Sequence, residues 1–203
     1  MPRTKKQNAD IKELSIEKIR DAGLKLFATK GLAATSIVDI SELAGISTGL
    51  MYHYYKSKED LYAELVKSAV TSANAAVLEV AEMPLSPMEK TTLLAKNMLE
   101  SIEKYEMTAY FFVLMPQVFL NKLIPKKVKP FLKEVLLPKE IVKKIIIAGQ
   151  QTGEIVKGNP DALSVFFFSS FTGLCTYKLM MGKQFILPSV EMVTAMLLNK
   201  SYK

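Results

Sequence analysis

The chain of 203 residues is long enough for one large or two small domains, and its 49% hydrophobic content excludes extensive disorder. The net charge of +7 suggests a nucleic-acid partner, but the distribution of the charge weakens that inference. Residues 1–60 carry 10 basic and 8 acidic side chains, whereas residues 122–144 carry 8 lysines and 2 glutamates.

The chain begins with a polar, basic stretch and continues as helices, because no alternating run bounded by turn residues predicts a strand. Residues 1–12 are predicted to form a flexible basic arm, which could reach phosphates or the minor groove or could simply fray. A first helix is predicted from about Ser15 to Lys30, with Gly31 as its C-cap. Its buried stripe consists of Ile19, Leu24, Phe27 and Ala28.

Residues 35–62 have the pattern of a helix-turn-helix. Gly45 is predicted to end the first of two short helices in the left-handed conformation, which a residue without Cβ adopts freely. Thr35 or Ser36 can cap that helix, and Ser47 can cap the second one. The residues predicted to face the core or the helix crossing are Ile40, Ser41, Ala44, Ile46, Met51 and Tyr54.

The opposite face of the second short helix suits the major groove of DNA, and it carries Thr48, Gly49, Leu50, Tyr52 and His53. Backbone N–H groups at Thr48 and Gly49 are expected to favour a phosphate, and Leu50 could contact a thymine methyl group. Tyr52 and His53 offer polar tips to a phosphate or a base edge. Thr35 or Ser36 could also contact a phosphate.

A fourth helix is predicted to begin after Ser57, which can cap it, and to link two domains. Pro125, Pro130 and Pro138 divide a basic stretch that could be one kinked helix or two short ones, so the pattern leaves the helix boundaries between residues 116 and 140 open. The lysines of residues 122–144 are interpreted as solvated helix faces, with a second surface for nucleic acid or an anionic ligand as the alternative. The other predicted helices span about residues 88–105, 107–120, 139–153, 160–181 and 188–199.

Three consecutive phenylalanines, Phe166, Phe167 and Phe168, predict a helix that is covered on nearly all sides. A partner chain is the simplest cover, and a three-layer core within one chain is the alternative. Residues 162–181 are the most apolar stretch, but their serines, threonines and Lys178 favour a buried helix over a membrane span. No apolar run follows the basic N-terminal residues, so we expect a cytoplasmic protein without a secretory signal.

The sequence resembles the TetR family of bacterial transcriptional regulators over about its first 65 residues. The resemblance rests on Ile16–Gly31, Thr35, Ser36, Ile40, Ala44–Ser47, Gly49, Tyr52 and Tyr54–Leu61. The family often has a basic residue where this chain has Thr48, and usually a small or polar residue where it has Leu50. Contacts to DNA at these two positions should therefore differ from those of better-known members.

The resemblance implies a helix-turn-helix DNA-binding domain over residues 13–60 and a helical ligand-binding and dimerisation domain over residues 61–203. It implies that Lys58 contacts a phosphate and that residues 160–181 and 188–200 pair with their copies in a four-helix interface. It also implies a pocket for a small apolar or amphipathic effector. The candidate lining residues are Tyr105, Tyr110, Phe111, Met115, Phe131, Phe167 and Phe171.

An enzyme is not expected, because His53 is the single histidine and lies in the predicted DNA-reading helix. Cys175 is the single cysteine, lies in an apolar segment and is predicted to be a buried, inert thiol. We expect no catalytic residue, metal or cofactor. The predicted function is a homodimeric repressor that a ligand releases from a palindromic operator; the alternatives are an activator or ligand-independent regulator of the same fold, or a helical enzyme.

Overall fold

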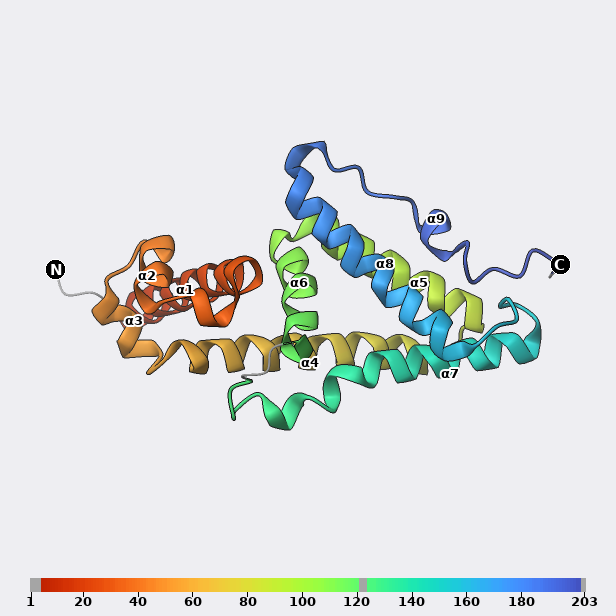
Figure 1. Ribbon diagram of the computed structural model, residues 1–203, viewed down its shortest axis with the longest axis horizontal. Coiled ribbons are helices and arrows are strands. Elements are labelled where there is room, and N and C mark those ends of the chain that lie inside the picture. Colours follow the sequence, from red (N-terminus) through yellow and green to blue (C-terminus); the bar gives the residue numbers. More distant parts are fainter. Residues whose placement is uncertain (1–4, 121–123, 202–203) are drawn as a thin grey trace. The chain divides into compact units, whose positions relative to one another are not determined.

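A computed structural model describes residues 5–120 and 124–201, which fold almost entirely into helices (Figure 1). Within these residues, the β structure is limited to an isolated bridge between Ile155 and Leu198, so the predicted all-α class is confirmed. The α-helices are α1 (Lys5–Ala34), α2 (Ile37–Ala44), α3 (Thr48–Tyr54), α4 (Lys58–Glu82), α5 (Pro87–Lys104), α6 (Glu106–Leu120), α7 (Leu137–Thr152), α8 (Pro160–Met181) and α9 (Val190–Thr194).

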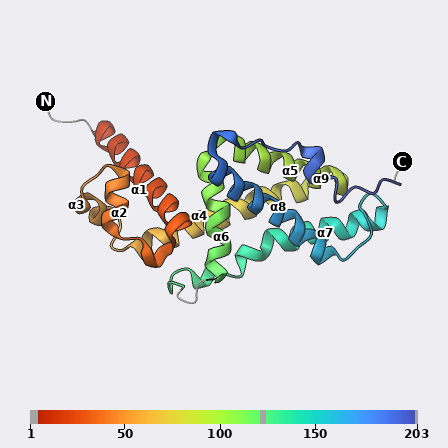
Figure 2. The same cartoon turned by 45° about the horizontal axis from the view of Figure 1, so that its top comes forward.

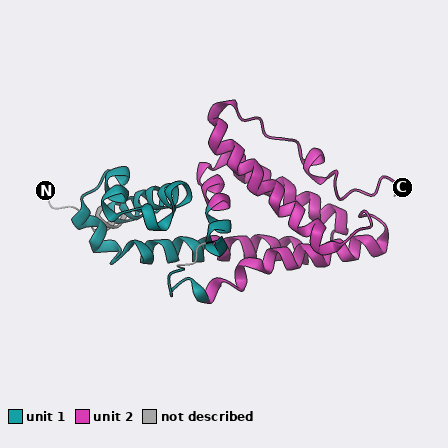
Figure 3. Cartoon of the chain, in the orientation of Figure 1, with its two compact units in different colours: residues 1–68, 114–129 teal, residues 69–113, 130–203 magenta. Residues whose placement is uncertain are grey.

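The chain divides into two compact units, coloured separately in Figure 3. Unit 1 comprises Met1–Ser68 and Leu114–Lys129, and unit 2 comprises Ala69–Val113 and Pro130–Lys203. Helices α4 and α6 therefore each contribute residues to both units. The division differs from the predicted boundary at residue 60, because the second half of α6 and the segment after it belong to unit 1.

Unit 1 has a core formed where α1 meets the helix-turn-helix and the start of α4. Phe27, Ile40 and Met51 are fully buried, and the Phe27 ring meets the Tyr62 ring edge to face at 5.3 Å. A Cβ on Gly23 would lie 2.5 Å from Leu61 Cδ2, so α1 and α4 can approach this closely only because residue 23 is glycine. The predicted stripe of the first helix is confirmed, since all its members are buried: Ile19, Leu24, Phe27 and Ala28.

Unit 2 has a separate core in which α8 runs beside α7 and α5, as Figures 1 and 2 show. Phe167 and Phe171 are fully buried on α8, and their rings meet at 5.2 Å. Cys175 lies one turn further along with no exposed surface, and burial raises the pKa of its thiol to about 12. The predicted inert thiol is consistent with this position, since the thiolate is disfavoured.

Helix α1 begins at Lys5, about ten residues earlier than predicted, so the predicted flexible arm is helical from that residue onward. Residues 1–4 of the predicted arm lie outside the described residues. Gly31 ends the regular part of the helix at a φ of 80°. Between residues 124 and 140, two short 3-10 helices, Lys129–Phe131 and Glu134–Leu136, lead into α7, so this stretch is not one kinked helix.

The predicted C-terminal helix over residues 188–199 is wrong, because α9 contains only the five residues Val190–Thr194. The chain then turns and pairs with the segment after α7: Val156 N–H donates to Leu197 O at 2.9 Å, and Asn199 N–H donates to Glu154 O at 3.1 Å. These bonds take the place of helical ones beyond Ala195, whose N–H still donates to Glu191 O at 2.9 Å. A four-helix dimer interface that uses residues 188–200 as a long helix is therefore excluded.

Two lysines of the basic stretch, Lys139 and Lys143, share the carboxylate of Asp161 at 3.0 and 2.6 Å. Hydrogen bonds from Lys143 and then Lys139 hold the pKa of Asp161 below its ordinary value. Lys127 forms an ion pair with Asp60. Some lysines of the basic stretch thus form ion pairs with carboxylates of their own unit. This agrees with the interpretation of the stretch as solvated helix faces.

Candidate nucleic-acid interface

Helix α2 begins at a complete capping box. The Ser36 hydroxyl accepts a hydrogen bond from Asp39 N–H at 3.0 Å, and Asp39 Oδ2 accepts one from Ser36 N–H at 2.8 Å. The hydrogen bond from the Ser36 hydroxyl is the main reason why the pKa of Asp39 lies below its ordinary value. Of the two candidate caps for this helix, Ser36 is therefore the one that is used.

The turn between α2 and α3 has the geometry that the sequence predicted. Gly45 is left-handed, with φ 66° and ψ 37°, and Ile46 N–H donates to Ser41 O at 3.0 Å. Ser47 caps α3, because its hydroxyl accepts from Leu50 N–H at 3.2 Å. Two short helices with their own start and stop signals are thus placed against each other at a fixed crossing.

Four of the six residues predicted to face inward are buried, namely Ile40, Ser41, Ala44 and Met51, whereas Ile46 and Tyr54 are half-buried. Tyr55 follows α3 with only 6% exposure, and its hydroxyl donates to Glu64 Oε1 at 3.1 Å. Arg20 reaches the same carboxylate oxygen at 3.5 Å. Burial, followed by the charge of Glu64, raises the pKa of Tyr55 well above its ordinary value. This network joins α1, the end of α3 and α4 within unit 1.

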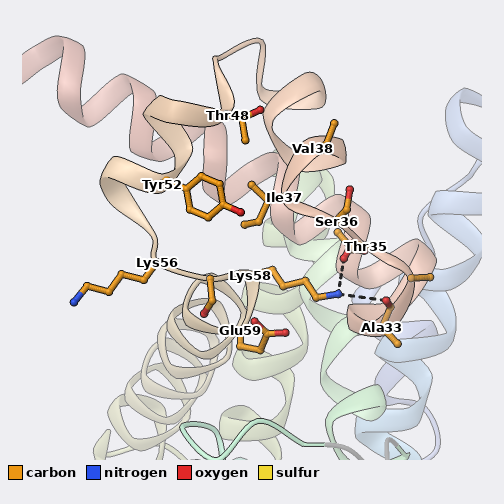
Figure 4. A pocket seen from close by; sticks show the side chains of 12 residues that line it. Ala33, Thr35, Ser36, Ile37, Val38, Thr48, Tyr52, Lys56, Lys58 and Glu59 are labelled. Carbon is orange, nitrogen blue, oxygen red and sulfur yellow. Dashed lines mark hydrogen bonds between the residues drawn. The ribbon is translucent and has the colours of Figure 1, made fainter.

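An open hollow of about 550 Å³ lies between the start of α2, the outer face of α3 and the start of α4 (Figure 4). Thr48 and Tyr52 line it from α3, and Ile37 and Val38 line it from α2. The segment before α4 forms its remaining side. Tyr52 is 55% exposed even though it is a large aromatic side chain. The remaining lining residues are Ala33, Ala34, Thr35, Ser36, Lys56, Ser57, Lys58 and Glu59.

The structure brings five of the eight predicted DNA-binding residues to this hollow: Thr35, Ser36, Thr48, Tyr52 and Lys58. Gly49 and His53 are exposed on α3, and Leu50 is half-buried. The Thr35 side chain is buried, and its hydroxyl donates to Gly31 O at 2.8 Å. The His53 ring meets the Tyr54 ring edge to face at 5.1 Å.

Sequence reasoning missed Lys56, Ile37 and Val38 as lining residues. Ile37 and Val38 begin α2, and no sequence signal marks an apolar residue there as part of the rim of a polar hollow. Lys56 lies in the connection between α3 and α4, and its place directly before the cap Ser57 was the available signal. A basic residue in a connection that borders a DNA-reading helix is a natural phosphate contact.

The seven predicted effector-binding residues do not share one environment. Tyr105 is 55% exposed at the end of α5, with the Lys104 ammonium 5.3 Å from its ring centroid. Met115 belongs to unit 1, whereas the other six belong to unit 2. Phe167 and Phe171 are fully buried, and Tyr110, Phe111 and Phe131 are half-buried. Two further rings, Phe112 and Phe168, pack against this pair and were not predicted.

The family model described as "Bacterial regulatory proteins, tetR family" matches residues 19–65, the span that holds the capping box, the left-handed Gly45 and α3. Residues 19–65 thus match the TetR family. The resemblance seen in the sequence is thus confirmed, and it is confirmed over the segment whose geometry is described above.

Among curated TetR-family relatives, the HTH-type transcriptional repressor KstR2 of Mycolicibacterium smegmatis is 36% identical over 78 residues. That match covers 38% of this chain and 38% of the repressor, so it is confined to about two fifths of each protein. The fatty acid metabolism regulator protein of Bacillus subtilis is 27% identical over 145 residues, which cover 69% of this chain and 70% of that regulator. These relatives are regulators, in agreement with the expectation that the chain is not an enzyme.

Among solved TetR-family structures, the ketosteroid transcriptional regulator KstR2 of Mycobacterium tuberculosis superposes with a TM-score of 0.72. The superposition covers 91% of this chain and 95% of that one at 17% sequence identity, which establishes a shared fold.

Residues 160–184, which include α8, form one segment of the described chain that is long and apolar enough to cross a membrane. The core helices of soluble proteins also reach this length and apolar content, so the segment is weak evidence for a membrane span.

Proposed function

We propose that the chain is a cytoplasmic, homodimeric transcriptional repressor that binds a palindromic operator through α2 and α3 and is released by a small molecule. One observation carries the proposal: α3 buries Met51 and turns Tyr52, 55% exposed, and Thr48 toward the open hollow beside α2. An exposed aromatic ring leaves apolar surface in water, which is unfavourable in the free protein. On a short helix whose ends are capped, the same ring is well placed to contact DNA.

The proposed contacts divide by position on the two helices. Thr48, Tyr52 and His53 present polar groups to bases or phosphates. Leu50 presents an apolar side chain to the methyl group of a thymine. Gly49 would let the DNA backbone approach α3 closely, because it has no side chain and the space at its Cβ position is open within 4 Å. At the start of α2, Ser36 lies beside a phosphate, while the buried Thr35 supports the turn from inside.

The proposed dimer uses the outer face of α8. Val165, Phe166, Tyr177, Met180 and Met181 are each between 45% and 73% exposed along this helix. Their positions place them along the outer surface of one long helix, which an isolated chain would leave in water. A second copy covers such a surface symmetrically. Because α9 is short, the proposed interface rests on α8 rather than on two long helices.

The proposed effector is apolar or amphipathic and binds in unit 2. The aromatic cluster of Phe112, Phe167, Phe168 and Phe171 supports this class, because a ligand among these rings would bury mainly hydrocarbon. The names of the relatives, a fatty acid metabolism regulator and a ketosteroid transcriptional regulator, support lipid-like molecules. A labelled complex with DNA, titrated with a long-chain fatty acid, its thioester and a steroid ketone, tests this class by release of the duplex.

The DNA-binding proposal is tested by selecting duplexes from a random-sequence pool with the full-length chain. Affinity for the enriched duplex is then measured by fluorescence anisotropy for the wild type, Tyr52→Ala and Tyr105→Ala. Tyr105 is the matched control because it is equally exposed, at 55%, but lies at the end of α5. We expect Tyr52→Ala to lose at least tenfold, which corresponds to about 1.4 kcal/mol, and Tyr105→Ala to bind like the wild type. Failure to enrich any sequence, or equal losses in both variants, would refute the proposal.

A further inference from the structure

Two lysines at the rim of the hollow, Lys56 and Lys58, have opposite surroundings although they are only two residues apart. Figure 4 shows the Lys56 side chain directed away from the hollow and the Lys58 side chain directed across it toward the end of α1. Lys56 is exposed, and Lys58 is half-buried. The TetR resemblance implied a phosphate contact for Lys58 and none for Lys56, so the two side chains need to be assigned from their contacts.

The Lys58 ammonium has three carbonyl acceptors. Its Nζ lies 2.8 Å from Leu32 O, 3.3 Å from Ala33 O and 2.6 Å from Thr35 O. These carbonyls belong to the end of α1 and to the turn into α2, where a helix leaves its last carbonyls without their full set of i+4 partners. A lysine ammonium has three N–H groups and no more, so these carbonyls engage its full set of donors.

Holding these carbonyls fixes the place where α2 begins. Thr35 is buried, its N–H donates to Leu32 O at 3.4 Å, and Ser36 follows it as the cap of α2. Lys58 is the first residue of α4, so its side chain ties the start of α4 to the start of α2. The positive charge is also favourable beside the carbonyl end of α1.

Lys56 has the complementary properties. Over residues 5–120 and 124–201, the structure gives its ammonium no hydrogen bond and no ion pair. The carboxylate of Asp60 is close enough for the Lys56 charge to contribute to its lowered pKa, but the hydrogen bond from Lys127 is the main cause. Asp60 is therefore already paired, and the exposed Lys56 ammonium keeps its donors available to solvent beside the segment that precedes α4.

We propose that Lys56 supplies the phosphate-contacting cation at this rim and that Lys58 is a positioning residue, which holds the start of α2 through three carbonyls. The assignment rests on the proposed DNA-binding function. It predicts a clear difference in salt dependence, because a cation that neutralises a phosphate releases a counterion and a cation that holds a carbonyl does not.

The test compares Lys56→Met with Lys58→Met, two matched substitutions that keep an unbranched stem and remove the charge. The binding constant for the enriched duplex is measured at several potassium chloride concentrations, and the slope of log K against log salt is compared. We expect Lys56→Met to reduce the magnitude of the slope by roughly 0.9 for each phosphate that the lysine neutralises in the wild type. We expect Lys58→Met to weaken binding without changing the slope and to lower the midpoint of thermal unfolding.

A chemical rescue separates the ammonium of Lys58 from general damage. Lys58→Cys is alkylated either with 2-bromoethylamine, which restores an ammonium on a side chain of lysine length, or with iodoacetamide, which adds a neutral amide. The native Cys175 is fully buried, so reaction is confined to residue 58. We expect aminoethylation alone to restore both the unfolding midpoint and the affinity.

The outcomes that overturn the assignment are distinct from those that overturn the function. A reduced slope in Lys58→Met together with an unchanged slope in Lys56→Met would reverse the two roles. Unchanged slopes in both variants would remove Lys56 as a phosphate contact, and this arm holds even if Lys58→Met does not fold. If the wild-type chain binds no duplex at any salt concentration, the proposed function fails together with the assignment.

Discussion

The two units differ in how completely each one buries its own apolar surface. In unit 1, the large exposed apolar residues are dispersed over α1, α2, α3 and α6. In unit 2, five of the large exposed apolar residues lie on the single helix α8, namely Val165, Phe166, Tyr177, Met180 and Met181. Unit 1 therefore exposes scattered apolar side chains, whereas unit 2 exposes several along one helix, the face that the proposed partner chain would cover.

This difference explains why the function of unit 1 can be inferred from its residues more directly than that of unit 2. Contacts in unit 1 depend on groups close together in the chain, such as the Ser36–Asp39 box and the Gly45 turn. The contacts proposed for unit 2 depend on a partner chain and on an effector, and a local sequence pattern encodes neither. The family model reflects the same contrast, because its match ends at residue 65.

The largest expected effect comes from truncating one matched phenylalanine in each core. Phe27→Ala and Phe167→Ala each remove a fully buried ring that packs edge to face on a neighbour. Each should lower the free energy of unfolding by about 3–5 kcal/mol, which calorimetry measures. Anisotropy and sedimentation should show that Phe27→Ala abolishes DNA binding while the protein remains a dimer. Loss of the dimer in Phe27→Ala would mean that the units do not fold independently.

A charge on the outer face of α8 should dissociate the proposed dimer. Phe166→Glu places a carboxylate at a position that is 59% exposed in the single chain and would be buried in the proposed dimer. An interface residue of this kind contributes about 2 kcal/mol or more, so sedimentation equilibrium should show a shift toward monomer. Leu14→Glu, 56% exposed on α1, is the matched control and should leave the dimer intact. Equal behaviour of the two variants would place the interface elsewhere.

Two glycines of the helix-turn-helix should respond in opposite ways to alanine. Gly45 has a positive φ, so Gly45→Ala should destabilise the chain by about 1–2 kcal/mol. Gly49 is helical with open space at its Cβ position, so Gly49→Ala should stabilise α3 by up to about 1 kcal/mol and yet weaken DNA binding. Urea denaturation and anisotropy measure the two effects. Unchanged DNA affinity in Gly49→Ala would remove Gly49 from the proposed interface.

The smallest effect concerns the cap of α2 and its pH dependence. Ser36→Ala should cost about 1 kcal/mol near neutral pH. Because Ser36 holds the pKa of Asp39 below its ordinary 3.8, the ionised carboxylate stabilises the fold above pH 3.8. That contribution is lost as the pH falls through the lower, folded-state pKa. Unfolding midpoints should therefore show the gap between the wild type and Ser36→Ala narrowing below pH 3.8; a constant gap would contradict the capping account.

The elements that the sequence predicted correctly are those with signals in adjacent residues. Helix α8 spans Pro160–Met181 as predicted, with Asn159 as its N-cap and Gly182 as its C-cap. The C-terminal helix failed because residues 197–199 find partners at residues 154–156, which lie some forty residues earlier in the chain. The carbonyl contacts of Lys58 were missed for the same reason, since its acceptors lie 23 to 26 residues away. Hydrogen bonds between residues so far apart in the chain produce no periodic pattern in the sequence, so a single sequence cannot predict them.

The central claim is that the surface around α3 binds DNA, and hydrogen–deuterium exchange with mass spectrometry tests it most directly. Exchange of the full-length chain is compared with and without the enriched duplex. The account predicts that protection concentrates in residues 36–56 and leaves the outer face of α8 unchanged, since the proposed dimer exists in both states. Protection confined to residues outside 36–56, or no protection at saturating duplex, would contradict it.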